Sequence, residues 1–342
     1  MDSGFYYRTG VIDHDGADTG KDPFMGSYPH LLDVGIMGHC VHGKTGLCVQ
    51  AGIQCYQDGL HKSQSNMKLD DFKSIVDQCK GKMFQIALGG RGDPDMHEDF
   101  EQIVSYCKAN DIIPNMTTSG YGLTEEKADL MKKYCGAIAV SWYRSPYTID
   151  AIEMLTGMGI KTNIHYVLGN NSIDEAYEMV SEKLIPKGIN RVIFLLHKPV
   201  GLGRSDNVLK PNDPKVEAFF KLFNQEENCN IAGFDSCCVP GVISFAPSIH
   251  LDSIDTCEAA RYSAYITPDM KMTPCSFDQE LRYEVDLYQH TIQEAWDSDV
   301  FDRFRNVLRM RCPGCEKKAY CLGGCPLKKE IVLCKEFQGV KM

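Results

Sequence analysis

The sequence predicts an α/β protein in which a parallel sheet built from βα repeats is followed by a smaller, cysteine-rich region. Two patterns support this prediction. Between residues 31 and 200, short apolar runs alternate with amphipathic segments, as in repeats of strand and helix. Seven of the 16 cysteines then gather after residue 256. At 342 residues, the chain is long enough for one large domain and a smaller one.

The apolar runs predict six strands, and the segments between them predict five helices. The expected strands span 31–37, 83–90, 112–120, 137–142, 161–169 and 191–201. The expected helices span 68–80, 96–111, 124–135, 145–159 and 172–188. Strands that alternate with helices pair in parallel, and ligands bind at the carboxyl ends of such strands. We therefore expect the functional residues in the segments that directly follow the strands.

Composition narrows the classes of protein to which the chain can belong. Apolar residues make up 43% and charged residues 24%, which is typical of an ordinary globular protein. The net charge of -10, without a long run of Lys or Arg, argues against a nucleic-acid partner. The first residues lack the pattern of a secretory signal, and no apolar stretch approaches the roughly 18 residues of a membrane span. We therefore expect a cytoplasmic protein whose reduced cysteines bind metal rather than form disulfides.

Glycine and serine residues follow several of the predicted strands. They are Gly89, Gly90, Gly92, Ser119, Ser141, Gly201 and Gly203. A single glycine turn after a strand is common in proteins of every function. Several at one edge of a sheet, beside a group of cysteines that follows the first strand, indicate a binding site.

The cysteines fall into two classes. Cys79, Cys107, Cys135 and Cys229 are isolated in helix-like or strand-edge segments, where a cysteine is typically a small buried hydrophobe. The segment RCPGCEKKAYCLGGC, residues 311–325, instead brings four cysteines together on turns made by proline and glycine. Such a group indicates a metal site. Zinc and iron–sulfur clusters both remain open on spacing alone, and the irregular gaps favour iron–sulfur.

Three further cysteines, Cys40, Cys48 and Cys55, follow the first predicted strand. Three thiolates on a cubane of four irons leave one iron without a protein ligand. In this respect the chain resembles the radical S-adenosylmethionine (radical SAM) enzymes. The resemblance implies a partial (β/α)6 barrel at residues 31–230, after a lead-in at 1–30. It also implies a [4Fe-4S] cluster whose open iron binds S-adenosylmethionine.

The same resemblance gives roles to the residues at the strand ends. The GGRGDP motif, residues 89–94, would let the backbone approach the methionyl amino group of the cofactor. Ser119 and Ser141 would meet its carboxylate or ribose. The glycine turn VGLGR, residues 200–204, would lie near the adenine.

The C-terminal cysteines resemble those of the SPASM subfamily, whose extension carries auxiliary iron–sulfur clusters. In that subfamily, two widely spaced cysteines precede a C-x2-C-x5-C-x3-C motif and one final cysteine. The matching residues are Cys257, Cys275, Cys312, Cys315, Cys321, Cys325 and Cys334. The resemblance therefore implies a SPASM-type domain at residues 231–342.

These seven cysteines would divide between two auxiliary [4Fe-4S] clusters. One set is Cys312, Cys315, Cys321 and Cys334. The other set is Cys257, Cys275 and Cys325. The second set has a vacancy, which either stays open for a substrate group or takes an upstream cysteine. Adjacent side chains in extended backbone point in opposite directions, so at most one of Cys237 and Cys238 should reach this position. We favour Cys237, because it follows the turn-forming residues DS, which would aim it inward. Packing alone would also account for this pair.

Two features depart from the family pattern. The usual first motif is C-x3-C-x2-C, whereas the gaps here are seven and six residues. Glycines within the loop would let it fold back, and His39 or His42 is considered as an additional ligand. Met270 stands where the SPASM pattern has a glycine, which affects an expected turn rather than a ligand.

The resemblance implies an oxidoreductase or maturase that cleaves S-adenosylmethionine reductively and abstracts hydrogen from a substrate. A peptide or protein substrate is favoured, because most SPASM-type relatives modify peptides. Oxidation of a small molecule is the alternative. A zinc-stabilised scaffold and a simple iron–sulfur electron carrier are the interpretations from other classes. An electron donor such as flavodoxin or ferredoxin is the other expected partner, and the sequence identifies no general base.

Overall fold

The computed structural model describes residues 25–250, 253, 254 and 256–337, so most of the predicted lead-in at 1–30 lies outside the described residues. Six parallel strands form the centre of the molecule, as predicted. They are β1 (Leu31–Met37), β2 (Gln85–Gly90), β3 (Ile113–Thr118), β4 (Ile138–Ser141), β5 (Thr162–Leu168) and β6 (Arg191–Leu196). A short strand, β7 (Ala232–Phe234), continues the sheet beside β6.

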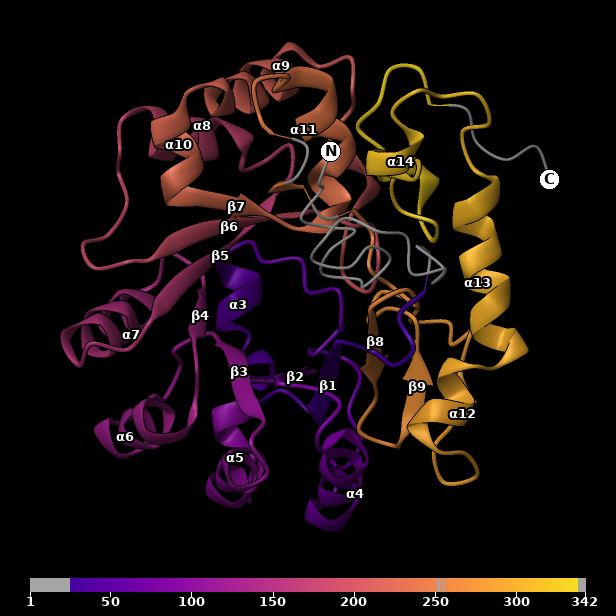
Figure 1. The fold of residues 1–342 in the computed structure, drawn as a ribbon. Helices are drawn as coiled ribbons and strands as arrows, with labels where there is room; N and C mark the ends of the chain where they lie inside the picture. Colours follow the sequence, from indigo (N-terminus) through magenta and orange to yellow (C-terminus); the bar gives the residue numbers. More distant parts are fainter. Residues whose placement is uncertain (1–24, 251–252, 255, 338–342) are drawn as a thin grey trace, which may run out of the picture.

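Helices between the strands cover the outer side of the curved sheet (Figure 1). They are α4 (Leu69–Cys79), α5 (Phe100–Ala109), α6 (Glu125–Tyr134), α7 (Pro146–Gly157), α8 (Ile173–Ser181) and α9 (Pro214–Lys221). The five predicted helices are present, with shorter bounds. The segment Pro94–Met96 forms a separate 3-10 turn before α5, and α8 ends ahead of Pro186, which cannot continue a helix.

Side chains alternate across the strands and so separate the hydrophobic core from the inner face of the sheet. In β1, Leu32, Val34 and Ile36 are completely buried in the core, together with apolar residues of α4. Asp33 lies between them in sequence and therefore points to the opposite, inner face. Cys79 and Cys107 are fully buried in the core of the outer layer, as expected for isolated cysteines, whereas Cys135 and Cys229 are only partly buried against the core.

The C-terminal region extends the same sheet from its other edge. Strand β8 (Ser263–Ile266) pairs in parallel with β1, and β9 (Lys271–Thr273) and β10 (Val285–Asp286) follow as antiparallel strands. Met270, in the turn between β8 and β9, has a left-handed φ of 62°, so the expected turn forms without glycine. Because one sheet runs through both regions, the boundary at residue 231 stays a prediction.

The complete sheet has ten strands in the order β10-β9-β8-β1-β2-β3-β4-β5-β6-β7. With β7 and β10 at its two ends, the sheet is an open, partial barrel (Figure 1). The helices after α9 are α10 (Glu226–Ile231), α11 (Val239–Phe245), α12 (Ile292–Trp296), α13 (Asp299–Met310) and α14 (Lys318–Cys321). None of the helices in the described part of the chain has the length and apolar character needed to cross a bilayer.

Candidate cluster and cofactor site

The loop that carries the first three cysteines begins where β1 ends. It contains two short helices, α2 (Val41–Thr45) and α3 (Leu47–Gln50), which take up the extra residues between the cysteines. The backbone N–H of Gly43 donates to Sγ of Cys40 at 2.9 Å, so this thiol caps α2. Cys48 lies on α3, and all three thiols are within electrostatic reach of one another. The wide spacing is therefore compatible with one converging group.

His42 holds this loop against the opposite side of the rim. Its ring stacks on Tyr121 and Tyr143 with centroid distances of 5.1 and 5.4 Å. Its Nε2 is 2.7 Å from the hydroxyl of Tyr147, which lies in the first turn of α7. His42 is only 3% exposed, and burial lowers the pKa of its imidazole. These contacts give His42 a role in positioning the cysteine loop, where the sequence had suggested an additional ligand.

The glycine motif after β2 packs closely against the cysteine loop. Gly90 has a φ of +119°, and a Cβ there would lie 2.6 Å from the backbone oxygen of Met37. A Cβ on Gly92 would lie 2.5 Å from the backbone oxygen of His39. Both glycines are therefore needed for packing, and substitution of Gly90 would disturb β1. At Gly89, by contrast, an added Cβ would meet only Oδ1 of Asp33, at 3.3 Å.

Arg91, in the same motif, ties the rim together. Its Nε donates to the backbone oxygen of Gln57 at 3.0 Å, and its guanidinium also donates to the backbone oxygen of Gly38 at 2.9 Å. On the far side of the site, a Cβ on Gly201 would lie 2.4 Å from the backbone oxygen of Tyr56. The loop after β6, which also carries Gly203, thus also packs on the cysteine loop.

Ser119 lies at the end of β3, buried beside a carboxylate that the sequence did not single out. Its backbone N–H and its hydroxyl donate to the two oxygens of Asp93, at 2.7 and 2.6 Å. Burial, reinforced by Asp95, raises the pKa of Asp93 to about 7. Asp93 also acts electrostatically on the thiols of Cys40 and Cys48. Ser119 and Asp93 therefore form a pair that lies within electrostatic reach of the cysteine loop.

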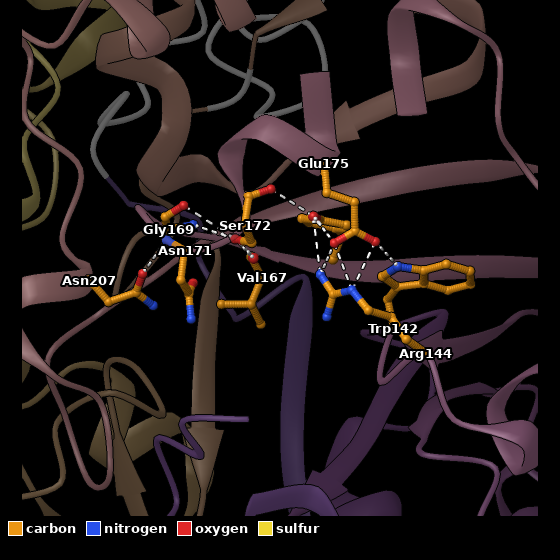
Figure 2. Close-up of polar contacts among 9 residues, drawn as sticks. Trp142, Arg144, Val167, Gly169, Asn171, Ser172, Glu175 and Asn207 are labelled. Atoms are coloured by element: carbon orange, nitrogen blue, oxygen red, sulfur yellow. Dashed lines mark hydrogen bonds and ion pairs between the residues drawn. The ribbon is translucent and has the colours of Figure 1, made fainter. Parts of the chain in front are cut away.

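Ser141 ends β4, and the loop after it is anchored to α8 (Figure 2). Glu175 accepts hydrogen bonds from Nε1 of Trp142 at 2.9 Å and from Nε of Arg144 at 2.8 Å. Arg144 has a left-handed φ of 58°, a conformation that these contacts help to hold. The neighbouring rim after β5 is fixed in turn by Ser172, whose hydroxyl donates to the backbone oxygen of Val167 at 2.8 Å. The loops after β4 and β5 are therefore held in place by residues at the start of α8.

The inner face of the barrel carries polar groups below this rim. On β3 and β5, the hydroxyl of Thr117 lies 3.2 Å from Nδ1 of His165. Burial lowers the pKa of His165 to about 4 and raises the pKa of Asp33 to about 7. A Cβ on Gly35 would lie 2.3 Å from the hydroxyl of Tyr265, so glycine there leaves room for that tyrosine. The sequence showed Asp33 only as one carboxylate within an apolar strand.

The C-terminal cysteines form a second and a third group. The thiols of Cys237 and Cys325 share a hydrogen bond, and those of Cys257 and Cys275 act electrostatically on this pair. Cys238 instead points into the core, where its completely buried thiol faces the backbone oxygen of Phe194 at 3.8 Å. The third group contains Cys312, Cys321 and Cys334, which interact electrostatically. Cys315 is exposed, and its backbone N–H donates to the backbone oxygen of Cys312.

A comparison with protein families decides the nature of this region. Residues 257–325 match SPASM, the iron–sulfur cluster-binding domain. Residues 257–325 are a SPASM domain. The match begins at the first cysteine of the expected pattern and ends at the last cysteine of its C-x2-C-x5-C-x3-C motif. The expected resemblance is thereby confirmed for this part of the chain.

Curated and solved relatives extend the comparison to the barrel. The PqqA peptide cyclase of Methylocella silvestris is 22% identical over 267 residues, which cover 68% of this chain and 67% of that protein. Streptococcus suis SuiB bound to S-adenosylmethionine has a TM-score of 0.68 at 16% identity, covering 91% of this chain and 77% of that one. The structure of anSMEcpe with bound AdoMet and a peptide has a TM-score of 0.61 at 17% identity, covering 90% and 91%. The predicted fold, a partial barrel followed by a SPASM domain, is confirmed.

The SPASM domain contacts the cysteine loop of the barrel. The ring of Tyr56, next to Cys55, lies 4.3 Å from the ring of Phe277, measured between centroids. Phe277 comes two residues after Cys275. Nearby, the side-chain amide of Gln279 donates to the side-chain oxygen of Gln57 at 3.2 Å. The first two cysteine groups are therefore connected through directly packed residues.

The donor groups are those that an iron–sulfur cluster requires. Each group consists of cysteines, and burial raises the pKa of the thiols of Cys40 and Cys257 to about 12. Metal binding would therefore be coupled to loss of the thiol protons. Among the described residues, no three or more His, Cys, Asp or Glu side chains are arranged to hold a single metal ion. In a [4Fe-4S] cubane, each thiolate would bind a different iron.

Proposed function

We propose that this protein is a radical S-adenosylmethionine enzyme that modifies a peptide or protein. The observation that carries the proposal is the group of three cysteines at the carboxyl end of β1, next to a SPASM domain. The chemistry that a [4Fe-4S] cluster supplies in such a site is one-electron cleavage of S-adenosylmethionine to methionine and a 5′-deoxyadenosyl radical, which takes hydrogen from the substrate. Cys40, Cys48 and Cys55 are the proposed ligands of this cluster.

The surrounding residues give this site its shape. Gly89, whose lack of a side chain leaves room beside Asp33, is a proposed backbone contact with the cofactor, and the Asp93 carboxylate, held by Ser119, suits its positively charged amino group. Arg91 and His42 keep the cysteine loop against the rim, which limits access of water to the site. Ser141, Gly201 and Gly203 remain the proposed contacts with the rest of the cofactor.

A peptide substrate is supported by the relatives. One is named as a peptide cyclase, and Streptococcus suis SuiB has been solved bound to the precursor peptide SuiA, with a TM-score of 0.67. We propose further that a small electron carrier such as flavodoxin or ferredoxin reduces the cluster. The cytoplasm, a reducing compartment, is the proposed location, because the proposed cluster ligands are cysteines that must stay reduced.

The proposal is tested with anaerobically reconstituted, full-length protein. With dithionite and S-adenosylmethionine, it should form methionine and 5′-deoxyadenosine, measured by liquid chromatography and mass spectrometry. A short peptide encoded beside this gene should change mass only when both reagents are present. A brown protein that never forms 5′-deoxyadenosine would instead be an electron carrier, and a colourless zinc protein would be a scaffold. Turnover of a small molecule in place of every tested peptide would contradict the substrate class.

Within this function, we propose Asp33 as the group that accepts a proton from the substrate. Its carboxyl group lies on the inner face of the barrel beside Gly89, and Tyr56 and Tyr265 are the titratable groups that face it. Among the described residues, no cation is paired with it. A carboxyl group with a pKa near neutral pH can take up and release a proton under working conditions.

Replacing Asp33 with Asn should change how stability depends on pH. The pKa of Asp33 is raised from 3.8 to about 7 in the folded protein, so the folded state binds this proton more tightly. Between about pH 4 and pH 7, the wild type should therefore lose stability relative to Asp33→Asn as pH rises, by at most about 1.4 kcal/mol per pH unit. Urea unfolding across this range measures the difference. Asp129→Asn, at an exposed site on α6, is the matched control and should show no such trend.

The same variant separates proton transfer from cofactor cleavage. Asp33→Asn should still form 5′-deoxyadenosine, while modification of the peptide falls and loses its dependence on a group that titrates near neutral pH. Unchanged modification by Asp33→Asn would exclude Asp33 as the proton acceptor.

A further inference from the structure

A buried ammonium group lies beside the second group of cysteines. Lys198 follows β6 and is only 4% exposed. Its Nζ donates to Oδ2 of Asp235 at 2.8 Å and to the backbone oxygen of Leu196 at 2.9 Å. Nζ also lies 4.2 Å from the centroid of the Phe277 ring. Burial disfavours the charged form, but the Asp235 carboxylate and nearby thiols outweigh it and raise the pKa of Lys198, so the group stays charged.

Two residues that contact Lys198, Asp235 and Phe277, lie within two or three residues of cysteines. Asp235 accepts a hydrogen bond from the backbone N–H of Cys238 at 3.1 Å and so caps the short 3-10 turn that carries Cys237. Phe277 lies two residues after Cys275. The charge of Lys198 acts on the thiols of Cys237, Cys275 and Cys325. The position of the Lys198 ammonium group therefore depends on the segments that carry Cys237 and Cys275.

Stability alone does not explain this arrangement. A buried ion pair generally contributes little net stability, because desolvation of the two charges offsets their attraction. A cation beside a cluster has a different effect. Four thiolates give a [4Fe-4S] cluster a net negative charge, which grows by one when the cluster accepts an electron. A nearby positive charge favours the more negative, reduced state and raises the reduction potential.

We propose that Lys198 sets the reduction potential of an auxiliary cluster held by Cys237, Cys257, Cys275 and Cys325. In this step, the cluster gains one electron from an external reductant, and no bond is formed or broken. The inference rests on the iron–sulfur part of the proposed function, but not on cleavage of S-adenosylmethionine. Among the described residues, Arg261 and Arg311 also act on cysteines of this group, and the Asp235 carboxylate acts on Cys237 with the opposite sign.

The test is a redox titration of the reconstituted full-length protein, followed by electron paramagnetic resonance. Cysteine-loop variants with Cys40, Cys48 and Cys55 replaced by Ala remove the first cluster's signal. Of the signals that remain in this variant, the one that disappears when Cys237→Ala is added belongs to the cluster beside Lys198. In Lys198→Met, its reduction should become at least about tenfold less favourable, a shift of about 59 mV to lower potential. Lys198→Arg, which keeps the charge, should leave the potential near that of the wild type.

Two controls keep the outcome specific. Lys271→Met removes a lysine of the SPASM domain whose Nζ is 2.8 Å from Asp286, and it should not shift this signal. Lys198→Gln removes the charge but retains a hydrogen-bond donor for Asp235, in case Lys198→Met fails to assemble. An unchanged potential in an iron-replete, uncharged variant would overturn the proposal. A shift of the potential in Lys198→Arg as large as that in Lys198→Met would also overturn it. The same holds if no signal depends on Cys237, or if both uncharged variants lose iron.

Discussion

Replacing Cys40, Cys48 and Cys55 together with Ala is expected to abolish cleavage of S-adenosylmethionine. The three thiols form one group at the carboxyl end of β1, where Cys48 and Cys55 act electrostatically on Cys40. Without them, the rim could no longer bind the proposed [4Fe-4S] cluster. Formation of 5′-deoxyadenosine should fall by at least about 1,000-fold, because this chemistry belongs to the bound cofactor rather than to the protein.

Iron content distinguishes this loss from general unfolding. The variant should retain the iron of the SPASM domain, since those cysteines lie on other segments of the chain. Cys79→Ala with Cys107→Ala is the matched control, because both cysteines are completely buried on the core-facing sides of α4 and α5. That control should keep both its iron and its activity, apart from a small loss of stability. Continued formation of 5′-deoxyadenosine by the triple variant would show that the cluster site lies elsewhere.

The second large effect is expected at the adjacent pair Cys237 and Cys238. Cys237→Ala should lose the iron of one auxiliary cluster, roughly one third of the total if three [4Fe-4S] clusters are bound. The thiol of Cys237 already shares a hydrogen bond with Cys325, and Cys257 and Cys275 are nearby. The 3-10 turn capped by Asp235 directs the two neighbouring side chains to different sides.

Cys238→Ala is the natural control for this experiment. Its thiol is buried in the core near Phe194, so replacement should retain all iron and cost about 1 kcal/mol or less of unfolding free energy for the small cavity. Iron analysis and electron paramagnetic resonance of both variants measure the effect. If iron is lost from Cys238→Ala instead, the two assignments must be exchanged. Full iron in both variants would mean that the position stays open for a substrate group.

The barrel was predictable from the sequence to the extent that its signals are local. Each of the six central strands is an apolar run such as 31–37, bounded by glycine or polar residues, and each helix shows an apolar stripe. The short helices α2 and α3 were not predictable, because the segment between the cysteines has no apolar periodicity. Their stability comes from Cys40 capping α2 and from contacts of His42 with tyrosines on other loops.

Some residues of the candidate site were likewise recognisable from the sequence, and others only from the structure. The cysteines were recognisable because thiols on glycine-rich turns are rare outside metal sites. Asp93 and Lys198 carried no such signal, because single charged residues after a strand are common. Asp33 was equally inconspicuous within its apolar strand. Their significance depends on burial and on partners that are distant in sequence, such as Ser119 for Asp93 and Asp235 for Lys198.

The sequence by itself determined the alternation of strands and helices, the cysteine groups and the edge of the sheet at which they meet. These properties follow from periodicity and spacing, which act over a few residues. Only the tertiary structure decided that Cys237 rather than Cys238 turns toward Cys325, and that a lysine lies beside this group. It also decided that Asp33 points inward. Contacts of this kind depend on how β1, β6 and the SPASM domain pack together, since burial and charge act through space and not along the chain.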